Sequence, residues 1–167
     1  MKKMAPRFSG FLLILLLCFT FNCTQQGEKV NVEADIAAVK EIGNQYAVAC
    51  NTGDLDLYIS IWTDDGVQMP PDAPAVIGKE KIRARMKPLF DQFIMDISVS
   101  IEEVGIGGDW AFARCTYTLS LTPKSGGETT MIDGKDLHIL ERQADGSWKI
   151  AIDCFNSNVP PPPPKQE

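Results

Sequence analysis

The sequence predicts an α+β fold, in which three helices come first and cover one side of an antiparallel sheet. Apolar residues recur every three or four positions over residues 31–93, which is the period of an amphipathic helix. From Asp96 onward they alternate with polar residues, which is the period of a half-buried strand. Short turns join the strand segments as hairpins, and helices followed by hairpins are typical of the α+β class.

Two helices are expected at the start of the domain. The first begins after Asn31, whose side chain can cap it, and ends at Gly53, because glycine suits the left-handed conformation of a helix terminus. Asp54 then caps a second, shorter helix. The residues expected to face the core are Ile36, Val39, Ile42, Tyr46 and Cys50 in the first helix and Leu55, Tyr58, Ile59 and Trp62 in the second.

A turn, a short strand and a third helix follow. Residues 64–66 carry turn chemistry, and the strand is expected from Val67 to Met69, before a loop that contains three prolines. The third helix begins near Gly78, and Pro88 is expected to kink it or to end it early. Its apolar positions are Ile82, Met86, Leu89, Phe90 and Phe93.

Four further strand segments complete the predicted sheet. Residues 96–102 and 111–121 each alternate apolar and polar side chains, so each strand has one wet face. A loop over residues 124–128 precedes a strand that contains residues 133–140, and the last strand ends near Asn156. Residues 160–167 form a proline-rich tail, which is typical of a stiff, solvated terminus.

The turn between the last two strands determines which side chains share a face. Residues 144–146 predict a three-residue hairpin loop, in which Gly146 takes the left-handed conformation and Glu141 lies opposite Lys149. A two-residue loop would shift the pairing by one position and set His138 against Asp153. We prefer the first register, because it matches the charges and groups the apolar residues. In this register the concave face collects Leu140, Ile150, His138, Ile152, Asp136, Cys154 and Asn156.

The first 22 residues have the pattern of an export signal. Three basic residues precede an uncharged apolar run over residues 11–21, which is shorter than the roughly 20 residues of a membrane-spanning helix. Cys23 resembles the acylated cysteine of bacterial lipoproteins, although Thr20 and Asn22 depart from the usual motif. An ordinary cleaved signal remains the alternative. We therefore expect an exported bacterial protein, periplasmic or anchored to a membrane by lipid at Cys23, with residues 23–30 as a tether and residues 31–159 as the domain.

Composition excludes several classes of function. The chain has 16 basic and 22 acidic residues, and removal of the signal changes the net charge from −6 to −9, which argues against nucleic acid as a partner. The three cysteines of the domain lie in apolar patterns, so we expect buried thiols rather than a disulfide framework. With a single histidine and no phosphate-binding or dinucleotide motif, the sequence predicts no metal site and no cofactor.

Two regions carry a resemblance to a known superfamily. Residues 44–56 (NQYAVACNTGDLD) and 61–67 (IWTDDGV) resemble the nuclear transport factor 2-like superfamily, especially its steroid delta-isomerase and SnoaL-like branches. Residues 145–150 (DGSWKI) and 153–160 (DCFNSNVP) resemble an uncharacterised group of small SnoaL-like bacterial proteins, which usually have tryptophan in place of Phe155. The resemblance implies a cone-shaped, strongly bent antiparallel sheet packed against three N-terminal helices, the cystatin-like roll.

The isomerase branch also implies roles for individual residues. Tyr46 stands where that family has its oxyanion-hole tyrosine, and Asp136 stands where it has a protonated aspartic acid. Pro70 occupies the place of the family's proton-shuttling aspartate and can neither accept nor donate a proton. Asp72 lies two residues further on, a displacement that would spoil the geometry of proton transfer. Ketosteroid isomerisation itself is therefore disfavoured.

The candidate site combines these residues with others expected near the concave face. The candidate catalytic residues are Tyr46, Asp136 and His138. The candidate ligand-binding residues are Trp62, Met69, Tyr117, Asp153 and Asn156. Asp136 among apolar neighbours is expected to have a raised pKa, which would let it donate a hydrogen bond or a proton to a carbonyl oxygen.

Three functions remain open from the sequence. The first is cofactor-free acid-base catalysis on an apolar carbonyl compound, of the isomerase or cyclase kind, with His138 or Asp153 moving a proton. The second is a module that binds an apolar small molecule without turnover. The third is an assembly protein whose outer sheet face forms a homodimer, as is common in the superfamily. The polar face of residues 96–102 weakens this third possibility.

Overall fold

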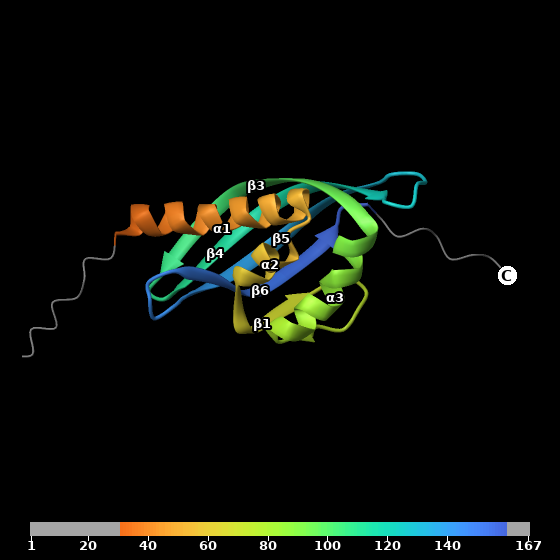
Figure 1. Cartoon of the computed structure of the whole chain (residues 1–167). Helices are drawn as coiled ribbons and strands as arrows, with labels where there is room; N and C mark the ends of the chain where they lie inside the picture. Colours follow the sequence, from red (N-terminus) through yellow and green to blue (C-terminus); the bar gives the residue numbers. More distant parts are fainter. Residues whose placement is uncertain (1–30, 160–167) are drawn as a thin grey trace, which may run out of the picture.

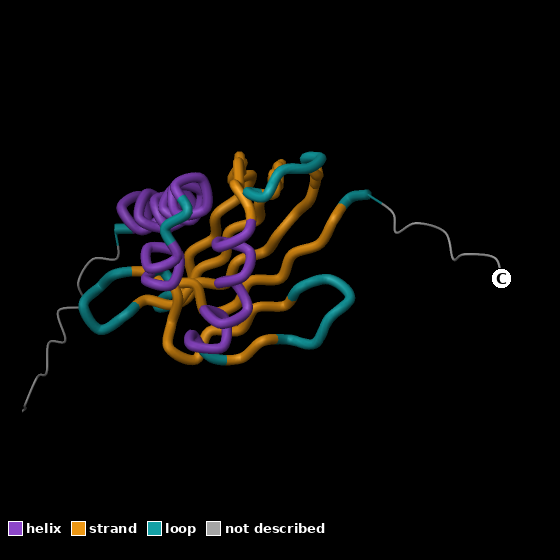
Figure 2. Tube along the Cα trace, turned by 45° about the vertical axis from the view of Figure 1, so that its right-hand side comes forward, coloured by secondary structure: helices purple, strands orange, loops and turns teal. Residues whose placement is uncertain are grey.

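The computed structural model describes residues 31–159 and confirms the α+β class (Figure 1). The helices come early in the chain and pack on one side of a six-stranded sheet, as Figure 2 shows from a second direction. The elements, in chain order, are α1 (Val32–Thr52), α2 (Leu55–Ser60), β1 (Trp62–Met69), β2 (Val76–Ile77), α3 (Lys79–Gln92), β3 (Phe93–Gly107), β4 (Trp110–Pro123), β5 (Thr130–Arg142) and β6 (Trp148–Ser157).

The sheet is mixed rather than purely antiparallel as predicted. Its strand order is β2-β1-β6-β5-β4-β3, and every neighbouring pair is antiparallel except β1 with β6. The chain leaves β1, passes through α3 and the β3–β4–β5 meander, and returns with β6 alongside β1. The helix and the long meander between these two strands allow the parallel pairing, which a tight hairpin cannot make.

The first two helices have the predicted caps. The Asn31 side chain accepts a hydrogen bond from the Ala34 amide, and Gly53 ends α1 with φ of 72°. The Asp54 carboxylate likewise accepts from the Leu57 amide at the start of α2. The helix α2 ends at Ser60, so Trp62 opens β1 instead of continuing the helical face, and the strand begins five residues earlier than expected.

The third helix and the strand after it also differ from the expectation. Pro88 does not end α3, which continues to Gln92 and leads directly into β3 at Phe93. Proline removes one helical hydrogen bond, to the carbonyl four residues earlier. Ala84 and Pro88 are both exposed, so that carbonyl is open to water and the cost of the lost bond is small.

The β5–β6 hairpin follows the preferred register near its loop and the rejected one beyond it. Gly146 has φ of 84° and Glu141 pairs with Lys149, as predicted. One extra residue, Ala151, then forms a bulge, because Leu140 pairs with Ile150 but Ile139 pairs with Ile152. Beyond the bulge His138 lies opposite Asp153. The assignment of Ile152, Cys154 and Asn156 to the concave face was therefore wrong, and Asp153 and Phe155 face inward instead.

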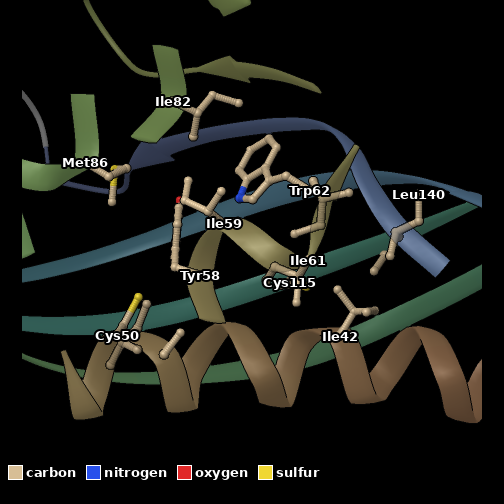
Figure 3. Packing of buried hydrophobic residues seen from close by; sticks show 14 of the residues in the cluster. Ile42, Cys50, Tyr58, Ile59, Ile61, Trp62, Ile82, Met86, Cys115 and Leu140 are labelled. Carbon is tan, nitrogen blue, oxygen red and sulfur yellow. The ribbon is translucent and has the colours of Figure 1, made fainter. Parts of the chain in front are cut away.

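The core lies between the three helices and the inner face of the sheet. Figure 3 shows side chains of α1, α2, β1 and α3 converging there, with Tyr58, Ile59 and Trp62 at the centre. All three are at most 1% exposed. Burying an apolar side chain of this size contributes about 1.5–3 kcal/mol. None of the described helices has both the length and the apolar character that crossing a membrane requires.

Candidate active site

A small cavity lies between α1 and the inner face of the sheet. Its volume is about 60 Å³, and its walls come from one helix and four strands. The lining residues are Tyr46, Ile97, Tyr117, Leu119, Asp136, Asp153 and Phe155. A pocket for a drug-sized ligand is typically about 300–1,000 Å³, so this cavity takes only the end of a larger molecule.

A larger hollow of about 320 Å³ lies elsewhere, near the tip of the β3–β4 hairpin. It is lined by apolar residues and glycines, among them Ile106, Trp110 and Phe112, and no ionisable side chain takes part. Acid-base chemistry needs groups that exchange protons, and the smaller cavity is lined by Asp136 and the buried Asp153, so it is the chemical candidate.

The helix α1 is fixed above this cavity by the Asn51 side chain, which pairs with the backbone of β3 as a neighbouring strand would. The Asn51 side chain donates a hydrogen bond to the Ile97 carbonyl at 3.0 Å and accepts one from the Ile97 amide at 2.6 Å. Both backbone groups of Ile97 are thus satisfied by α1. The contact holds Tyr46, one and a half turns earlier in the helix, against the strands that carry the acidic residues.

Three ionisable side chains meet beside the cavity. Asp136 and His138 are two positions apart on β5 and therefore share a face, and the bulge brings Asp153 of β6 opposite His138. The His138 Nε2 atom lies 3.5 Å from Asp153 Oδ1 and 3.9 Å from Asp136 Oδ1. His138 is 4% exposed and Asp153 is 1% exposed. The site thus has two acids and one imidazole held almost out of water.

The pKa values of His138 and Asp136 are both raised, for different reasons. Burial alone would lower the pKa of His138, but the contact with Asp153 and the negative charges of Asp153 and Asp136 outweigh it, so the pKa is raised. Burial raises the pKa of Asp136, the charge of Asp153 adds to this, and His138 opposes it. His138 and Asp136 therefore retain their protons more strongly than the same groups in water.

The carboxylates of this cluster lack the hydrogen-bond donors that buried carboxylates normally have. Within the described part of the chain, Asp136 Oδ1 and both oxygens of Asp153 have no hydrogen-bond partner. The contact of Asp153 with His138, at 3.5 Å, is an ion pair too long for a well-formed hydrogen bond. Each unsatisfied buried group costs about 1–3 kcal/mol. These oxygens are consequently available to accept a proton or a hydrogen bond from a bound molecule.

A chain of polar groups leads from the cavity to the surface at α3. The ring of Tyr46 lies 5.7 Å from the ring of His138 and 5.2 Å from the ring of Tyr58. Gln68, which is 1% exposed, donates to the Tyr58 hydroxyl at 3.0 Å and accepts from Arg85 at 2.8 Å. Burial raises the pKa of Tyr46 and of Tyr58 well above the usual value, so both remain phenols that can donate hydrogen bonds.

Tyr117 reaches the cavity because its cross-strand partner is a glycine. Gly134 pairs with Tyr117 on the neighbouring strand, and a Cβ atom at Gly134 would lie 2.3 Å from the tyrosine ring. Only glycine leaves room for the ring to lie over the backbone of β5. Burial raises the pKa of Tyr117 to about 12, so this phenol is a further hydrogen-bond donor at the cavity wall.

One set of side chains in the site has the composition of a metal centre. The potential ligand atoms of Cys115, Asp136 and His138 lie within 4.8 Å of one another. Cysteine, aspartate and histidine together suit zinc. Burial, with the nearby charge of Asp136, raises the pKa of Cys115 well above its usual value, and metal binding requires the thiolate. The protonated thiol weakens this set as a ligand group.

The structure brings together five of the residues selected from the sequence and leaves three aside. Tyr46, Tyr117, Asp136, His138 and Asp153 surround the cavity. Trp62 is fully buried in the core, Met69 is 41% exposed at the end of β1, and Asn156 is exposed on the opposite face of β6. Asp72 is an exposed loop residue outside the cavity lining, and Cys23 lies outside the described residues.

Sequence reasoning missed the polar chain behind Tyr46 and one wall of the cavity. Gln68 is a polar residue with apolar neighbours on both sides in β1, a pattern that could have marked it as buried and paired. Phe155 was not recognised as a wall of the cavity, because the predicted register placed it on the outer face of the sheet. Arg85 gave no signal, because its position on α3 looks like any charged position of an amphipathic helix.

The fold agrees with the protein family and the solved structures to which the chain is similar. Residues 44–151 match the protein family described as SnoaL-like domain. A ketosteroid isomerase-like protein from Erwinia carotovora atroseptica SCRI1043 is 31% identical, with a TM-score of 0.69 over 75% of this chain and 98% of that one. A conserved protein from Planctomyces limnophilus DSM 3776 is 27% identical, with a TM-score of 0.70 over 75% and 98%.

More distant structures share the fold alone. A nuclear transport factor 2-like superfamily protein from Salmonella enterica subsp. enterica serovar Typhimurium str. LT2 is 12% identical, with a TM-score of 0.68 over 81% of this chain and 99% of that one. The comparison with curated proteins returned no match.

Proposed function

Since this chain belongs to the SnoaL-like domain family, we propose that it catalyses proton transfer on a small carbonyl compound without a cofactor, as an isomerase does. The observation that carries the proposal is the meeting of Asp136, His138 and Asp153 beside a small cavity, where three carboxylate oxygens have no hydrogen-bond donor among residues 31–159. Such an arrangement offers a proton donor and a proton acceptor to one bound group.

The proposed roles follow from the positions of the cluster residues. Asp153, which lies 3.5 Å from the His138 ring, is the proposed base and takes the proton from the carbon next to the carbonyl. Asp136, whose pKa is raised by burial, is the proposed donor, and in its protonated form it donates a hydrogen bond to the carbonyl oxygen as negative charge develops on it. Tyr46 donates a second hydrogen bond to the same oxygen. With a β,γ-unsaturated ketone this step gives a dienolate, and return of the proton from Asp153 to its γ-carbon completes the isomerisation.

The small volume of the cavity supports a substrate that inserts only its reacting end. About 60 Å³ accommodates a carbonyl group and one or two neighbouring carbons, since a water molecule occupies about 30 Å³ in the liquid. The aromatic side chains of Tyr117 and Phe155 suit a planar, apolar portion next to that carbonyl.

The experiment is the conversion of cyclohex-3-en-1-one into its conjugated isomer, followed by ultraviolet absorbance and by deuterium incorporation in heavy water. We expect catalysis by the wild-type protein and a loss of about 10²–10⁴-fold in His138→Gln and Asp136→Asn. Asp96→Asn, an exposed aspartate on β3, serves as the matched control and should keep full activity. Equal rates in the wild-type protein, the two site variants and buffer would refute the proposal.

A second candidate function is binding without turnover. The aromatic walls and the hydrogen-bond donors of Tyr46 and Tyr117 favour a ligand that carries a carbonyl, whether or not the carbonyl reacts. Ligand-observed NMR with the same ketone separates the two functions, because a binding module would give saturation transfer in the wild-type protein with no deuterium incorporation.

We also propose self-association through the outer face of the sheet. Trp110 and Leu137 point away from the helices on neighbouring strands, and they are 49% and 42% exposed. Apolar side chains of this size at a surface are typical of protein interfaces. Sedimentation of the purified domain should give a dimer in the wild-type protein and a monomer in Leu137→Glu; a wild-type monomer would reject this proposal.

Export and lipid attachment at Cys23 are proposed from the N-terminal sequence alone. Mass spectrometry of the protein from its own membrane and soluble fractions should find an acylated Cys23 at the new N-terminus. An unmodified chain in the soluble fraction whose new N-terminus lies upstream of Cys23 would contradict lipid attachment but not export.

A further inference from the structure

Arg85 differs from the other arginines that the structure describes. Each of the other three forms an ion pair with a carboxylate: Arg83 with Asp56 at 2.6 Å, Arg114 with Glu103 at 3.2 Å and Arg142 with Asp35 at 2.6 Å. Arg85 has no carboxylate partner among residues 31–159, although the domain is rich in acidic residues. It is exposed, so a ligand can reach it.

The guanidinium group of Arg85 is nonetheless held in place. One nitrogen, Nη1, donates to the Gln68 side chain at 2.8 Å and also contacts the Met86 sulfur at 3.4 Å. The central carbon of the group lies 5.9 Å from the centre of the Phe155 ring, over its face. Gln68 is itself fixed by the Tyr58 hydroxyl. The arginine is therefore anchored on a buried amide and lies over an aromatic side chain, within reach of a cation–π contact.

This anchoring places a positive charge next to the cavity. Phe155 lines the cavity with Asp136 and Asp153, so the ring that supports Arg85 is also a wall of the site. The hydrogen bonds of Arg85 to Gln68 and Met86 use Nη1 alone, and two parallel N–H groups of a guanidinium match the two oxygens of a carboxylate. A group that is already oriented loses less conformational entropy when it binds.

We propose that Arg85 binds a carboxylate of the substrate, so that the substrate class of this site is a small carbonyl compound that also carries an acid group. The inference rests on the proposed proton transfer at Asp136, His138 and Asp153 and adds to it a specificity-determining residue. The negative charge of Asp153 would repel the acid group from the inner end of the cavity, whereas Arg85 attracts it. The two charges together orient the substrate with its carbonyl toward Asp136.

The test uses two compounds that differ in one charge, 3-oxocyclohexane-1-carboxylate and its methyl ester. Dissociation constants come from ligand-observed NMR, and deuterium incorporation next to the ketone is followed in the same samples. We expect the wild-type protein to bind the carboxylate about tenfold more tightly than the ester. Arg85→Gln should lose this preference by weakening carboxylate binding while leaving ester binding unchanged.

Two further variants separate a specific contact from general charge. Arg83→Gln removes a neighbouring arginine of α3 that is already paired with Asp56, and it should keep the full preference for the carboxylate. Arg85→Lys keeps the charge but loses the planar fork, so part of the preference should remain and should decline further as salt is added. Circular dichroism of each variant checks that α3 remains folded, and the Arg85→Lys result applies if Arg85→Gln fails to fold.

The outcomes distinguish this inference from the proposed function. Equal affinities of the wild-type protein for carboxylate and ester, no carboxylate binding at all, or an unchanged preference in Arg85→Gln would each overturn the role of Arg85. A preserved preference without any deuterium incorporation would instead contradict proton transfer and leave carboxylate recognition standing. Loss of the preference in Arg83→Gln would show that overall charge, rather than Arg85 itself, attracts the carboxylate.

Discussion

Two buried charged clusters lie on the β5–β6 hairpin, and they differ in how fully their oxygens are satisfied. In the first, Arg142 makes two hydrogen bonds to Asp35 of α1, at 2.6 and 2.7 Å, and stacks on Trp148. The Trp148 indole also donates to Asp35, at 3.3 Å. In the second, the cluster of Asp136, His138 and Asp153, three carboxylate oxygens have no hydrogen-bond partner in the described part of the chain.

This difference separates a structural cluster from a chemical one. The hydrogen bonds from Arg142 hold the pKa of Asp35 below its usual value against the opposing effect of burial, so the Asp35 cluster keeps a fixed charge. The pKa values of Asp136 and His138 are both raised, so their protons are retained where a substrate can receive them. A fully satisfied cluster fixes α1 on the hairpin, whereas an unsatisfied one leaves capacity for a ligand.

The same substitution in the two clusters should therefore have different consequences. Asp153→Asn removes the proposed proton acceptor, and we expect isomerisation of cyclohex-3-en-1-one to fall by about 10²–10⁴-fold. The initial rate measured by ultraviolet absorbance tests this. If Asp153→Asn kept activity close to that of the wild-type protein, Asp153 would have a structural role only, and the two clusters would not differ in function.

Asp35→Asn should act on stability instead. This change removes the negative charge and one acceptor oxygen from the pair with Arg142, which weakens two charge-assisted hydrogen bonds and costs about 3 kcal/mol in the free energy of unfolding. Urea denaturation measures this loss, and Asp109→Asn is the control, because Asp109 also contacts Arg142, at 3.5 Å, but is exposed. Isomerase activity per folded molecule should be unchanged. A strong loss of activity in folded Asp35→Asn would contradict this prediction, because it would show that the Asp35 cluster also contributes to catalysis.

A smaller effect is expected when the charge of the structural cluster is kept. Arg142→Lys retains an ion pair with Asp35 but loses the two parallel hydrogen bonds and the stacking on Trp148, and we expect a loss of about 1–2 kcal/mol. Urea denaturation of Arg142→Lys and Asp35→Asn in parallel ranks their losses in the free energy of unfolding. Equal stability of Arg142→Lys and the wild-type protein would show that charge alone holds α1 on the hairpin.

The contrast between the clusters also explains how much the sequence could predict. Local signals gave the helix caps at Asn31 and Asp54 and the glycine turn at Gly146, because each depends on residues close together in the chain. Asp136 and His138 could be placed on one face because β strands alternate with a period of two. These predictions needed no knowledge of distant contacts.

The remaining features depend on contacts between distant parts of the chain. The bulge at Ala151 reverses the inward and outward alternation of side chains in the middle of β6, and the neighbouring residues carry no sequence signal for it. Asp153 was therefore predicted at the cavity, but the preferred register did not place it opposite His138. The parallel pairing of β1 with β6 joins residues about 85 positions apart, as in Gln68 with Asp153. Arg85 stands out only because no carboxylate of residues 31–159 pairs with it, which is a property of the folded surface.

The smallest expected effects are those of pH on stability, and they have opposite signs in the two clusters. The folded-state pKa of Asp35 is lowered, so its contribution to stability is present above about pH 4 and is lost as the pH falls through the folded-state value. The folded-state pKa of His138 is raised, so its contribution is present below about pH 6.5 and is lost as the pH rises through the folded-state value. Urea denaturation across this range should show an acidic decline that weakens in Asp35→Asn and an alkaline decline that weakens in His138→Gln.

The single histidine of the chain allows a direct check on the alkaline decline. Its imidazole NMR signals need no assignment against other histidines, so their titration reports the pKa of His138 itself. Because Asp153 raises this pKa, Asp153→Asn should lower it, whereas Asp96→Asn should leave it at the wild-type value. An unchanged titration in Asp153→Asn would mean that the ion pair does not set the charge of His138. The donor and acceptor roles proposed for the cluster would then have to be reassigned.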